Sequence, residues 1–423
     1  MPNQTRSRPG TPSLLRELND RAALRLLLDG RSLTRSRLSE LTGVSKVTVA
    51  QMLVRLEERG LVAAVGEQAG GRGPNATLYS VVPSSAYVAG LYVEQGEVST
   101  AVADVTGKVI AEVREDTNGS SAPVELVRSA VDRACARAGV AVESLSAFVI
   151  GGPGVVDPRT GDPWLAINLP EWHEGVLDGL RGALRKPVLI ENDVNLAAIA
   201  ERAVGAAVGL DDFVLLWVGV GIGLATVLGG QLHRGASGAA GEIGWLPVPG
   251  APVTSNVRHP AGGGLQWLAG AGPVRELAEQ YGFGGQRASA AVRAAVHATG
   301  ALSSLTNHAD SAAAGHPDAD VDADGDADVA RATAFLDELA HRVALGATAV
   351  CAVLDPGLVV LGGEVGLAGG QVLADRVAAE VRRMCPVHPH VVPTAVSSEP
   401  VLRGALITAV DQARADLLAS VAG

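Results

Sequence analysis

The first part of the chain carries apolar residues at the spacing of an α-helix. Residues 14–29 place apolar side chains at every third or fourth position, and Gly30 can end the helix. The pattern predicts one buried face, made of Leu14, Leu18, Ala22 and Leu26 with Leu15 and Leu27 beside them.

Two shorter helices are predicted after this one, joined by a turn at Gly43. Thr34 and Ser45 each precede an apolar pattern, and their hydroxyls can accept a free backbone N–H at the start of a helix. The apolar positions are Leu38 and Leu41 in the first of the two helices and Val49, Leu53 and Leu56 in the second. Two short helices around a glycine-containing turn are typical of a helix-turn-helix, whose second helix can enter the major groove of DNA.

The second of these helices also has a polar side that suits DNA. Hydroxyls, amides and cationic groups near its N-terminal half can reach base edges and phosphates. The candidate DNA-binding residues on this helix are Ser45, Lys46, Thr48, Gln51 and Arg55. The alternative interpretation is an ordinary pair of helices with a solvated polar face.

A glycine-rich hairpin is predicted directly after the helices, which makes this part a winged helix-turn-helix. Residues 61–81, LVAAVGEQAGGRGPNATLYSV, contain two strand patterns around a Gly-rich tip. Arg72 in this tip can enter a minor groove, where the negative potential of DNA is concentrated. A solvated side chain on a mobile tip is the alternative.

From Tyr87 onward, short Val-rich strands alternate with Ala-rich helices, which is typical of an α/β fold. Three strands come first, with turns near Gln95–Gly96 and Thr106–Gly107. Further strands are predicted within 147–157, 187–201 and 357–365. Each leads into a polar or Gly-rich loop, where ligands of α/β folds are usually bound.

Residues 303–328 have low complexity and are predicted to form a solvated surface insertion. The run from Asp320 places Asp and Gly as a calcium loop does. However, Arg331 stands at the twelfth position, where such a loop needs a bidentate Glu.

Residues 213–230, FVLLWVGVGIGLATVLGG, carry no charge over 18 positions, the shortest length for a membrane-spanning helix. Five of them are glycines, and the Gly-Val-Gly-Ile-Gly alternation favours two buried strands joined by a tight turn. We therefore expect a hairpin here and no association with a membrane.

Composition adds to this picture mainly through charge. Residues 1–82 contain 12 Lys and Arg against 7 Asp and Glu, whereas the remainder contains 22 against 38. A basic head on an acidic body suggests that one end of the chain meets a polyanion.

The cysteines and the N-terminal sequence suggest a cytoplasmic protein. Cys135, Cys351 and Cys385 are far apart and odd in number, so neither a disulfide framework nor a cysteine zinc site is indicated. The opening MPNQTRSRPG lacks the apolar region of a signal peptide. With 423 residues, the chain is long enough for two or three domains.

Several motifs in this order resemble the ROK family of sugar kinases and sugar-responsive repressors. They are GGRGP at 70–74, GGPGVVD at 151–157, NLPEW at 168–172, ENDVNLAAIAER at 191–202, VGVGIGLATVLGG at 218–230, HRGASGAAGEIG at 233–244 and VVLGGEV at 359–365. The resemblance covers about residues 14–415. It implies a winged helix-turn-helix at 1–82, an actin-like (ribonuclease H-like) α/β body with lobes at 83–198 and 199–398, and a C-terminal helix at 399–423 that returns to the first lobe.

By the same resemblance, four residues take positions that hold sugar hydroxyls: Asn168, Asn192, Asp193 and Glu242. The chemistry agrees, because vicinal hydroxyls both donate and accept, and amides and carboxylates can pair with them. The alternative is that Asn192 and Asp193 only cap the helix that follows.

In the family's kinases the residue matching Asp193 deprotonates the sugar hydroxyl that attacks ATP. Their phosphate hairpin, Asp-x-Gly-Gly-Thr, corresponds here to Tyr92 followed by Glu94-Gln95-Gly96, and the carboxylates of Glu94 and Glu97 would repel a triphosphate. Their second phosphate loop has Thr where this chain has Val220. Since phosphoryl transfer depends on positioning and charge neutralisation, we expect no catalytic residue and no enzyme activity.

Trp245 is a second departure from the family. Many members have a His at this position, which contacts sugar, followed by a Cys-rich zinc loop, but the corresponding stretch here, HPAGGGLQWLAG, has no Cys. We expect neither zinc nor any other cofactor. A sugar ring could stack on the indole, which makes Trp245 a fifth candidate ligand residue.

These features predict a DNA-binding transcriptional regulator, a repressor, whose body senses a sugar or sugar derivative. Its expected partners are operator DNA, the sugar effector and further copies of itself, as a homodimer or homotetramer, because a two-fold operator requires a symmetric protein. The main alternative is an ATP-dependent sugar kinase that also binds DNA. A third possibility is a DNA-binding protein whose body no longer senses a ligand.

Overall fold

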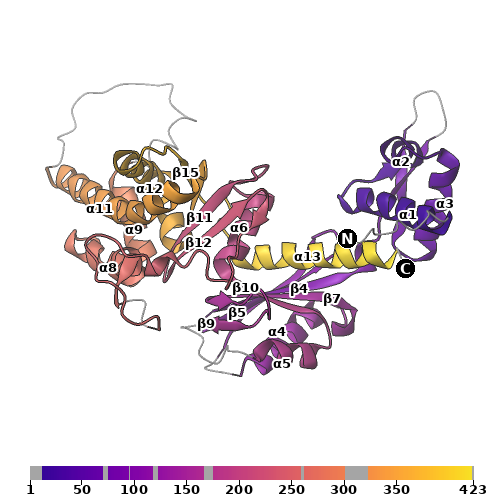
Figure 1. Cartoon of the computed structure of the whole chain (residues 1–423), viewed down its shortest axis with the longest axis horizontal. Coiled ribbons are helices and arrows are strands. Elements are labelled where there is room, and N and C mark those ends of the chain that lie inside the picture. The colour runs from indigo at the N-terminus through magenta and orange to yellow at the C-terminus, as the bar shows by residue number, and fades with distance from the viewer. Residues whose placement is uncertain are drawn as a thin grey trace, which may run out of the picture. The chain divides into compact units, whose positions relative to one another are not determined.

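The computed structural model describes residues 12–69, 75–94, 96–117, 122–165, 175–258, 262–300 and 323–421 (Figure 1). The chain divides into two compact units. Unit 1 comprises residues 1–151, 175–190 and 405–423, and unit 2 comprises residues 152–174 and 191–404. The division falls before residue 191, whereas the sequence suggested a boundary after residue 198. It does so because α6 (Asp193–Val204) packs on the strands of unit 2.

The N-terminal part of unit 1, which we call the head, is a winged helix-turn-helix. Its helices are α1 (Pro12–Leu28), α2 (Arg35–Thr42) and α3 (Lys46–Glu58), and its strands β1 (Leu33–Thr34), β2 (Val62–Gln68) and β3 (Ala76–Val81) pair in the order β1-β3-β2. The predicted caps are confirmed: the hydroxyls of Thr34 and Ser45 accept backbone N–H groups in the first turns of α2 and α3. Gly43 ends α2 in the left-handed conformation, at φ 72°.

Of the apolar residues that the spacing placed on one face of α1, Leu27 is buried but the others are not. Leu14, Leu15 and Leu18 are exposed, and so is Leu41 of α2. The buried positions of α1 are Asp20, Ala23, Leu24, Leu27 and Leu28. Because leucines occur in adjacent pairs along α1, the sequence fits more than one face. Contact with α3 and β3 decides which of them is buried.

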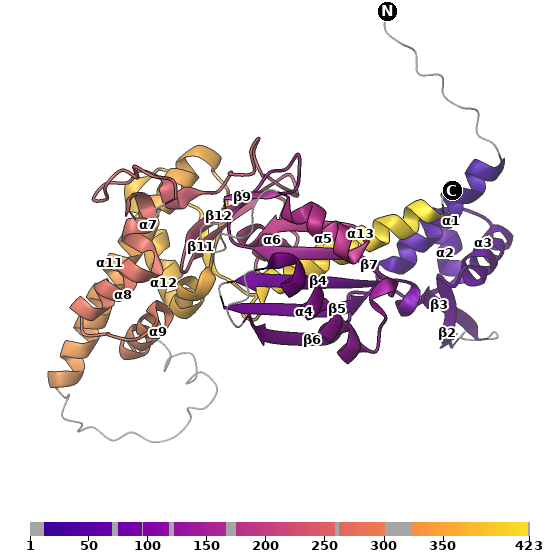
Figure 2. The ribbon, with the colours of Figure 1, turned by 90° about the horizontal axis from the view of Figure 1, so that it is seen from below.

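The rest of unit 1 is built on a five-stranded sheet in the order β10-β7-β4-β5-β6. Its strands are β4 (Tyr87–Glu94), β5 (Glu97–Asp104), β6 (Val109–Asp116), β7 (Leu145–Gly152) and β10 (Val188–Asn192). The predicted three-stranded start is confirmed, with turns at Gly96 and Gly107. Helices α4 (Pro123–Ala138) and α5 (Val176–Leu184) lie on one face of the sheet (Figure 2). The last helix, α13 (Pro400–Ser420), packs Leu406 against Gly90 of β4.

Unit 2 contains a second five-stranded sheet, in the order β13-β12-β11-β14-β15. Its strands are β11 (Phe213–Val218), β12 (Ile222–Leu228), β13 (Gln231–Leu232), β14 (Leu358–Gly362) and β15 (His390–Pro393). The pairing of β11 with β12 confirms the hairpin predicted for residues 213–230. Among the helices in the described ranges, none is long and apolar enough to cross a membrane.

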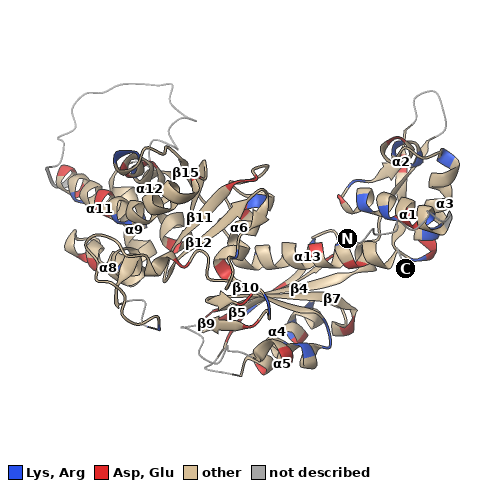
Figure 3. Cartoon of the chain, viewed as in Figure 1, with Lys and Arg blue, Asp and Glu red and all other residues tan. Residues whose placement is uncertain are grey.

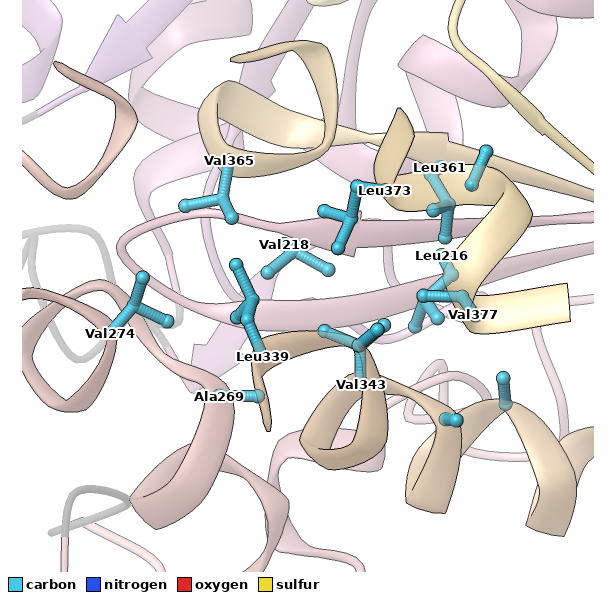
Figure 4. Close-up of a cluster of buried hydrophobic side chains, with 14 of the residues drawn as sticks. Leu216, Val218, Ala269, Val274, Leu339, Val343, Leu361, Val365, Leu373 and Val377 are labelled. Carbon is cyan, nitrogen blue, oxygen red and sulfur yellow. The ribbon is translucent and has the colours of Figure 1, made fainter. Parts of the chain in front are cut away.

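The core of unit 2 lies between this sheet and a layer of helices (Figure 4). The helices are α7 (Gly264–Ala269), α8 (Ala271–Gln280), α9 (Ala288–Ala298), α11 (Ala323–Leu354) and α12 (Gly363–Met384). Val214, Leu216 and Val218 alternate along β11 and point into this core, as expected for a strand.

The remaining short elements of the two units are β8 (Val155–Val156), β9 (Pro163–Leu165), η1 (Pro83–Ser85), η2 (Val142–Ser144) and η3 (Ile243–Trp245).

One predicted boundary needs correction. The low-complexity stretch was expected to remain a surface insertion up to residue 328, but α11 begins at Ala323. Residues 303–322 lie outside the described residues. Acidic residues are favourable in the first turn of a helix, which explains why an Asp-rich segment can start α11.

Gly404 of α13 lies against the backbone of α6, where a β-carbon would come within 1.9 Å of the carbonyl oxygen of Leu196. We expect Gly404→Ala to lower the free energy of unfolding by about 1–3 kcal/mol, because one of the two helices must move. All five tryptophans belong to unit 2, so urea unfolding followed by tryptophan fluorescence reports on that unit.

Gly272 of α8 provides the matched control, since nothing lies within 4 Å of an added β-carbon there. Gly272→Ala should leave stability unchanged or raise it by up to about 1 kcal/mol. Equal stability of the two variants would show that the contact between α6 and α13 tolerates a methyl group.

Candidate functional site

The sequence predicted a polar loop between a strand and a helix here, but β10 ends at Asn192 and α6 begins directly at Asp193. Asn192 is the N-cap: its Oδ1 accepts from the backbone N–H of Asn195 at 3.1 Å, and its Nδ2 donates to the carbonyl of Gly154 at 2.9 Å. Asp193 is the first residue of the helix. The capping interpretation therefore holds for Asn192. Its contact with a ligand, and that of Asp193, remain predictions.

Glu191, which the sequence analysis did not single out, organises this corner. Its side chain is almost fully buried, and its Oε2 accepts from Nε of Arg234 at 2.7 Å. Its Oε1 accepts from Nδ2 of Asn195 at 2.9 Å and from the backbone N–H of Asn192 at 3.0 Å. Glu191 and Arg234 both stand in motifs quoted above. They are 43 positions apart, so no local pattern in the sequence predicts that they form a pair.

Arg234 lies in the loop that carries Glu242, so the ion pair connects this loop to the start of α6. The loop is also attached to β12. The N–H of His233 donates to the carbonyl of Thr226 at 2.8 Å, and the N–H of Leu224 donates to the carbonyl of Gly241 at 2.9 Å. Gly241 has φ 98°, and a β-carbon there would lie 1.8 Å from the oxygen of Leu224. Only glycine fits this position, and the position of Glu242 depends on it.

The structure brings Asp193 and Glu242 close enough for their charges to interact. Burial and, to a smaller extent, the negative charge of Asp193 together raise the pKa of Glu242 to about 7. At neutral pH a substantial fraction of the Glu242 carboxyl is therefore protonated. A carboxyl beside a carboxylate can donate one hydrogen bond and accept others, which matches the hydroxyls of a sugar.

Trp245 is the last residue of η3, and this short helix begins directly after Glu242. Its indole Nε1 is buried and has no hydrogen-bond partner among the described residues. Buried donors are normally paired, so this N–H lacks the partner that such a group usually has among the described residues. Asn168, the remaining candidate, lies outside the described residues.

The turn that matches the second phosphate loop of the family's kinases forms hydrogen bonds with a side chain of α7. Gln266 accepts from the N–H of Ile222 at 2.8 Å and donates to the carbonyl of Val220 at 2.9 Å. At the end of the β4–β5 hairpin, Glu94 and Glu97 are directly opposite in register. Gln95, between them, lies outside the described residues.

The stretch where the family's zinc loop occurs is closed by backbone bonds. The N–H of Gly264 donates to the carbonyl of Pro252 at 2.8 Å, and the N–H of Leu265 donates to that of Leu246 at 3.0 Å. In the part of the chain that the structure describes, no three His, Cys, Asp or Glu side chains form a group suited to a metal ion. His259 lies outside that part.

In the head, Lys46 and Gln51 are exposed on α3. The hydroxyls of Ser45 and Thr48 lie 2.9 Å apart and bond to each other. Arg55 does not extend freely from the helix as expected of a phosphate contact, because its guanidinium forms two hydrogen bonds, of 2.8 and 2.5 Å, with the carboxylate of Asp20 on α1. We assign it to the packing of α3 on α1. Arg72 lies outside the described residues.

Comparison with known proteins shows similarity to both regulators and kinases. Residues 89–412 match the model of the ROK family. The xylose repressor of Caldicellulosiruptor bescii is 27% identical over 245 residues, which are 56% of this chain and 61% of that protein, so the match spans less than two thirds of that relative.

Two solved structures share the fold. One is a ROK family transcriptional regulator described as a homologue of the E. coli MLC protein. It has a TM-score of 0.67 at 18% identity and covers 97% of this chain and 99% of its own. The other is a ROK hexokinase from Thermus thermophilus, with a TM-score of 0.55 at 27% identity, covering 78% of this chain and 99% of its own.

Removing Arg234 should destabilise unit 2, because the buried carboxylate of Glu191 then lacks its cationic partner. We expect Arg234→Ala to lower the free energy of unfolding by about 2 kcal/mol, which is less than a fully buried pair would lose because the arginine remains partly exposed. Arg202→Ala is the matched control, since Arg202 and Asp211 form an exposed pair worth less than about 1 kcal/mol. Similar losses in the two variants would contradict the importance of the Glu191–Arg234 pair.

The raised pKa of Glu242 predicts a pH dependence of stability. Between its ordinary value of 4.5 and about 7, the folded state binds more protons than the unfolded state. The contribution of Glu242 to stability is therefore fully present below pH 4.5 and is lost as the pH rises through 7. Relative to Glu242→Gln, the unmodified protein should lose about 2 kcal/mol between pH 5 and pH 8 in urea titrations. The control is Glu279→Gln at an exposed site, which should show the same change of stability with pH as the unmodified protein. If all three proteins show the same pH profile, the pKa of Glu242 is not raised.

Proposed function

Since this chain belongs to the ROK family, we propose that it is a DNA-binding transcriptional regulator, a repressor, whose body senses a sugar or sugar derivative. The observation that carries the proposal is the winged helix-turn-helix of residues 12–81, which precedes the range matched by the family. A sugar kinase has no need of such a head, whereas a regulator requires it. The 12 basic and 7 acidic residues of 1–82 suit a DNA partner. Figure 3 colours those that belong to the described residues.

The proposed effector site consists of Asn168, Asn192, Asp193, Glu242 and Trp245. Asp193 and Glu242 would hold hydroxyls, and the unpaired indole N–H of Trp245 would donate to a further oxygen. Binding of the sugar would favour one arrangement of the body and so alter the spacing of two heads in a homodimer or homotetramer. Operator binding depends on that spacing. Such a regulator acts on DNA in the cytoplasm.

The alternative, a DNA-binding sugar kinase, requires a site for the phosphates of ATP. At the end of the β4–β5 hairpin, the carboxylate of Glu94 would repel a triphosphate, whereas that of Glu97 is paired with Arg114. Two backbone groups of the Val220 turn, the N–H of Ile222 and the carbonyl of Val220, are occupied by Gln266. Both features favour a sensor over a catalyst, in which Asp193 binds a hydroxyl and activates none.

The proposal predicts that the full-length protein binds one DNA sequence upstream of its own gene and releases it with one sugar from a panel. Fluorescence anisotropy at fixed salt, with competitor DNA, measures both steps. Asp193→Ala should bind the DNA as tightly as the unmodified protein. It should need about 10- to 100-fold more sugar for release, because it lacks a charged hydrogen-bond partner.

Asp211→Ala, which removes an exposed carboxylate elsewhere in unit 2, should respond to sugar normally. An unaltered sugar response in Asp193→Ala would move the effector site elsewhere. Turnover of ATP with any sugar in the panel, abolished in Asp193→Asn, would instead establish the kinase.

A further inference from the structure

An apolar side chain stands exposed near the N-terminus of α3, the helix expected to enter the major groove. Val47 is 70% exposed, although it lies between Lys46 and Thr48 in the first turn. The buried face of α3 consists of Val49, Met52, Leu53 and Leu56. Val47 is therefore outside the core of the head and takes no part in its packing.

Folding gives no reason for a valine at this position. A β-branched residue is a weak helix former, and an exposed apolar side chain gains nothing from the hydrophobic effect. The place of Val47 on the surface of the head is nevertheless fixed, because α3 itself is fixed. The cap at Ser45 determines where α3 begins, and the Arg55–Asp20 ion pair attaches the helix to α1.

We propose that Val47 contacts the 5-methyl group of a thymine in the major groove, a step that rests on the proposed function of DNA binding. Thymine is the only base that presents a methyl group there, and apolar side chains recognise it. Residues at the N-terminus of the second helix of a helix-turn-helix lie against base edges. An apolar side chain alone does not attract DNA. The excess of basic residues in the head provides that attraction.

Gln51 would add a second contact that also prefers an A·T pair. It is exposed four residues after Val47 and thus lies beside it on the helix surface. A glutamine amide can form two hydrogen bonds with adenine in the major groove. Val47 and Gln51 together would select a thymine and an adenine, which favours A·T pairs within each half-site.

The test replaces thymine by deoxyuridine, which removes only the methyl group. The full-length protein first selects a duplex from a random DNA library. Each thymine of that duplex is then replaced singly, and affinity is measured by anisotropy. We expect a three- to fivefold loss at one thymine of each half-site, about the effect of one methyl group leaving an apolar contact.

In Val47→Ala, the unsubstituted duplex should bind about three- to fivefold more weakly, and deoxyuridine at that thymine should cause no further loss. Val54→Ala is the matched control on the same helix. Val54 is also exposed, at 48%, but lies about 10 Å further along the axis. This variant must keep the full penalty at the thymine assigned to Val47.

A full deoxyuridine penalty in Val47→Ala, or insensitivity to deoxyuridine at every position, would overturn the contact while leaving DNA binding established. Failure of the library to yield any specific duplex would overturn the proposed function itself, and this inference with it. Circular dichroism of the variants separates these results from loss of folding, which an exposed Val→Ala change should not cause.

Discussion

The candidate site depends on the buried ion pair between Glu191 and Arg234. Burying a carboxylate costs free energy unless it is paired and fully hydrogen-bonded, and here Arg234, Asn195 and the backbone of Asn192 together meet that requirement. The pair joins two segments of unit 2 that are distant in sequence. One begins α6, and the other carries Glu242. The ion pair therefore connects the two segments that carry the candidate sugar-binding carboxyls.

Placing these two carboxyls together is unfavourable for the empty protein. The pKa of Glu242 rises to about 7 through burial and the charge of Asp193. No cation is among the groups that shift this pKa, so nothing in that set lowers it. Perturbed acids of this kind are concentrated at functional sites. The glycine at 241 and the bonds of the loop to β12 maintain the arrangement, as expected for a preorganised binding site.

The head uses an arginine–carboxylate pair in a related way. Arg55 is bonded to Asp20, so that α3 is held against α1, and the side chains free to meet DNA are those of the first turns, Lys46, Val47 and Gln51. In both units an arginine fixes the element that carries the binding residues, although for Arg55 the sequence predicted a contact with DNA. Arginine suits this task because its guanidinium bonds a carboxylate at two points.

Local patterns in the sequence were sufficient for the elements themselves. Helix caps at Thr34 and Ser45, the strands on either side of Gly96, and the hairpin at 213–230 all follow from interactions within a few residues. The motifs around Asp193 and Glu242 also marked the candidate site. Only the tertiary structure decided which face of α1 is buried, that Arg55 pairs with Asp20, and that Glu191 meets Arg234. The physical reason is that periodicity and capping depend on neighbours along the chain, whereas burial and ion pairing depend on which surfaces meet after folding.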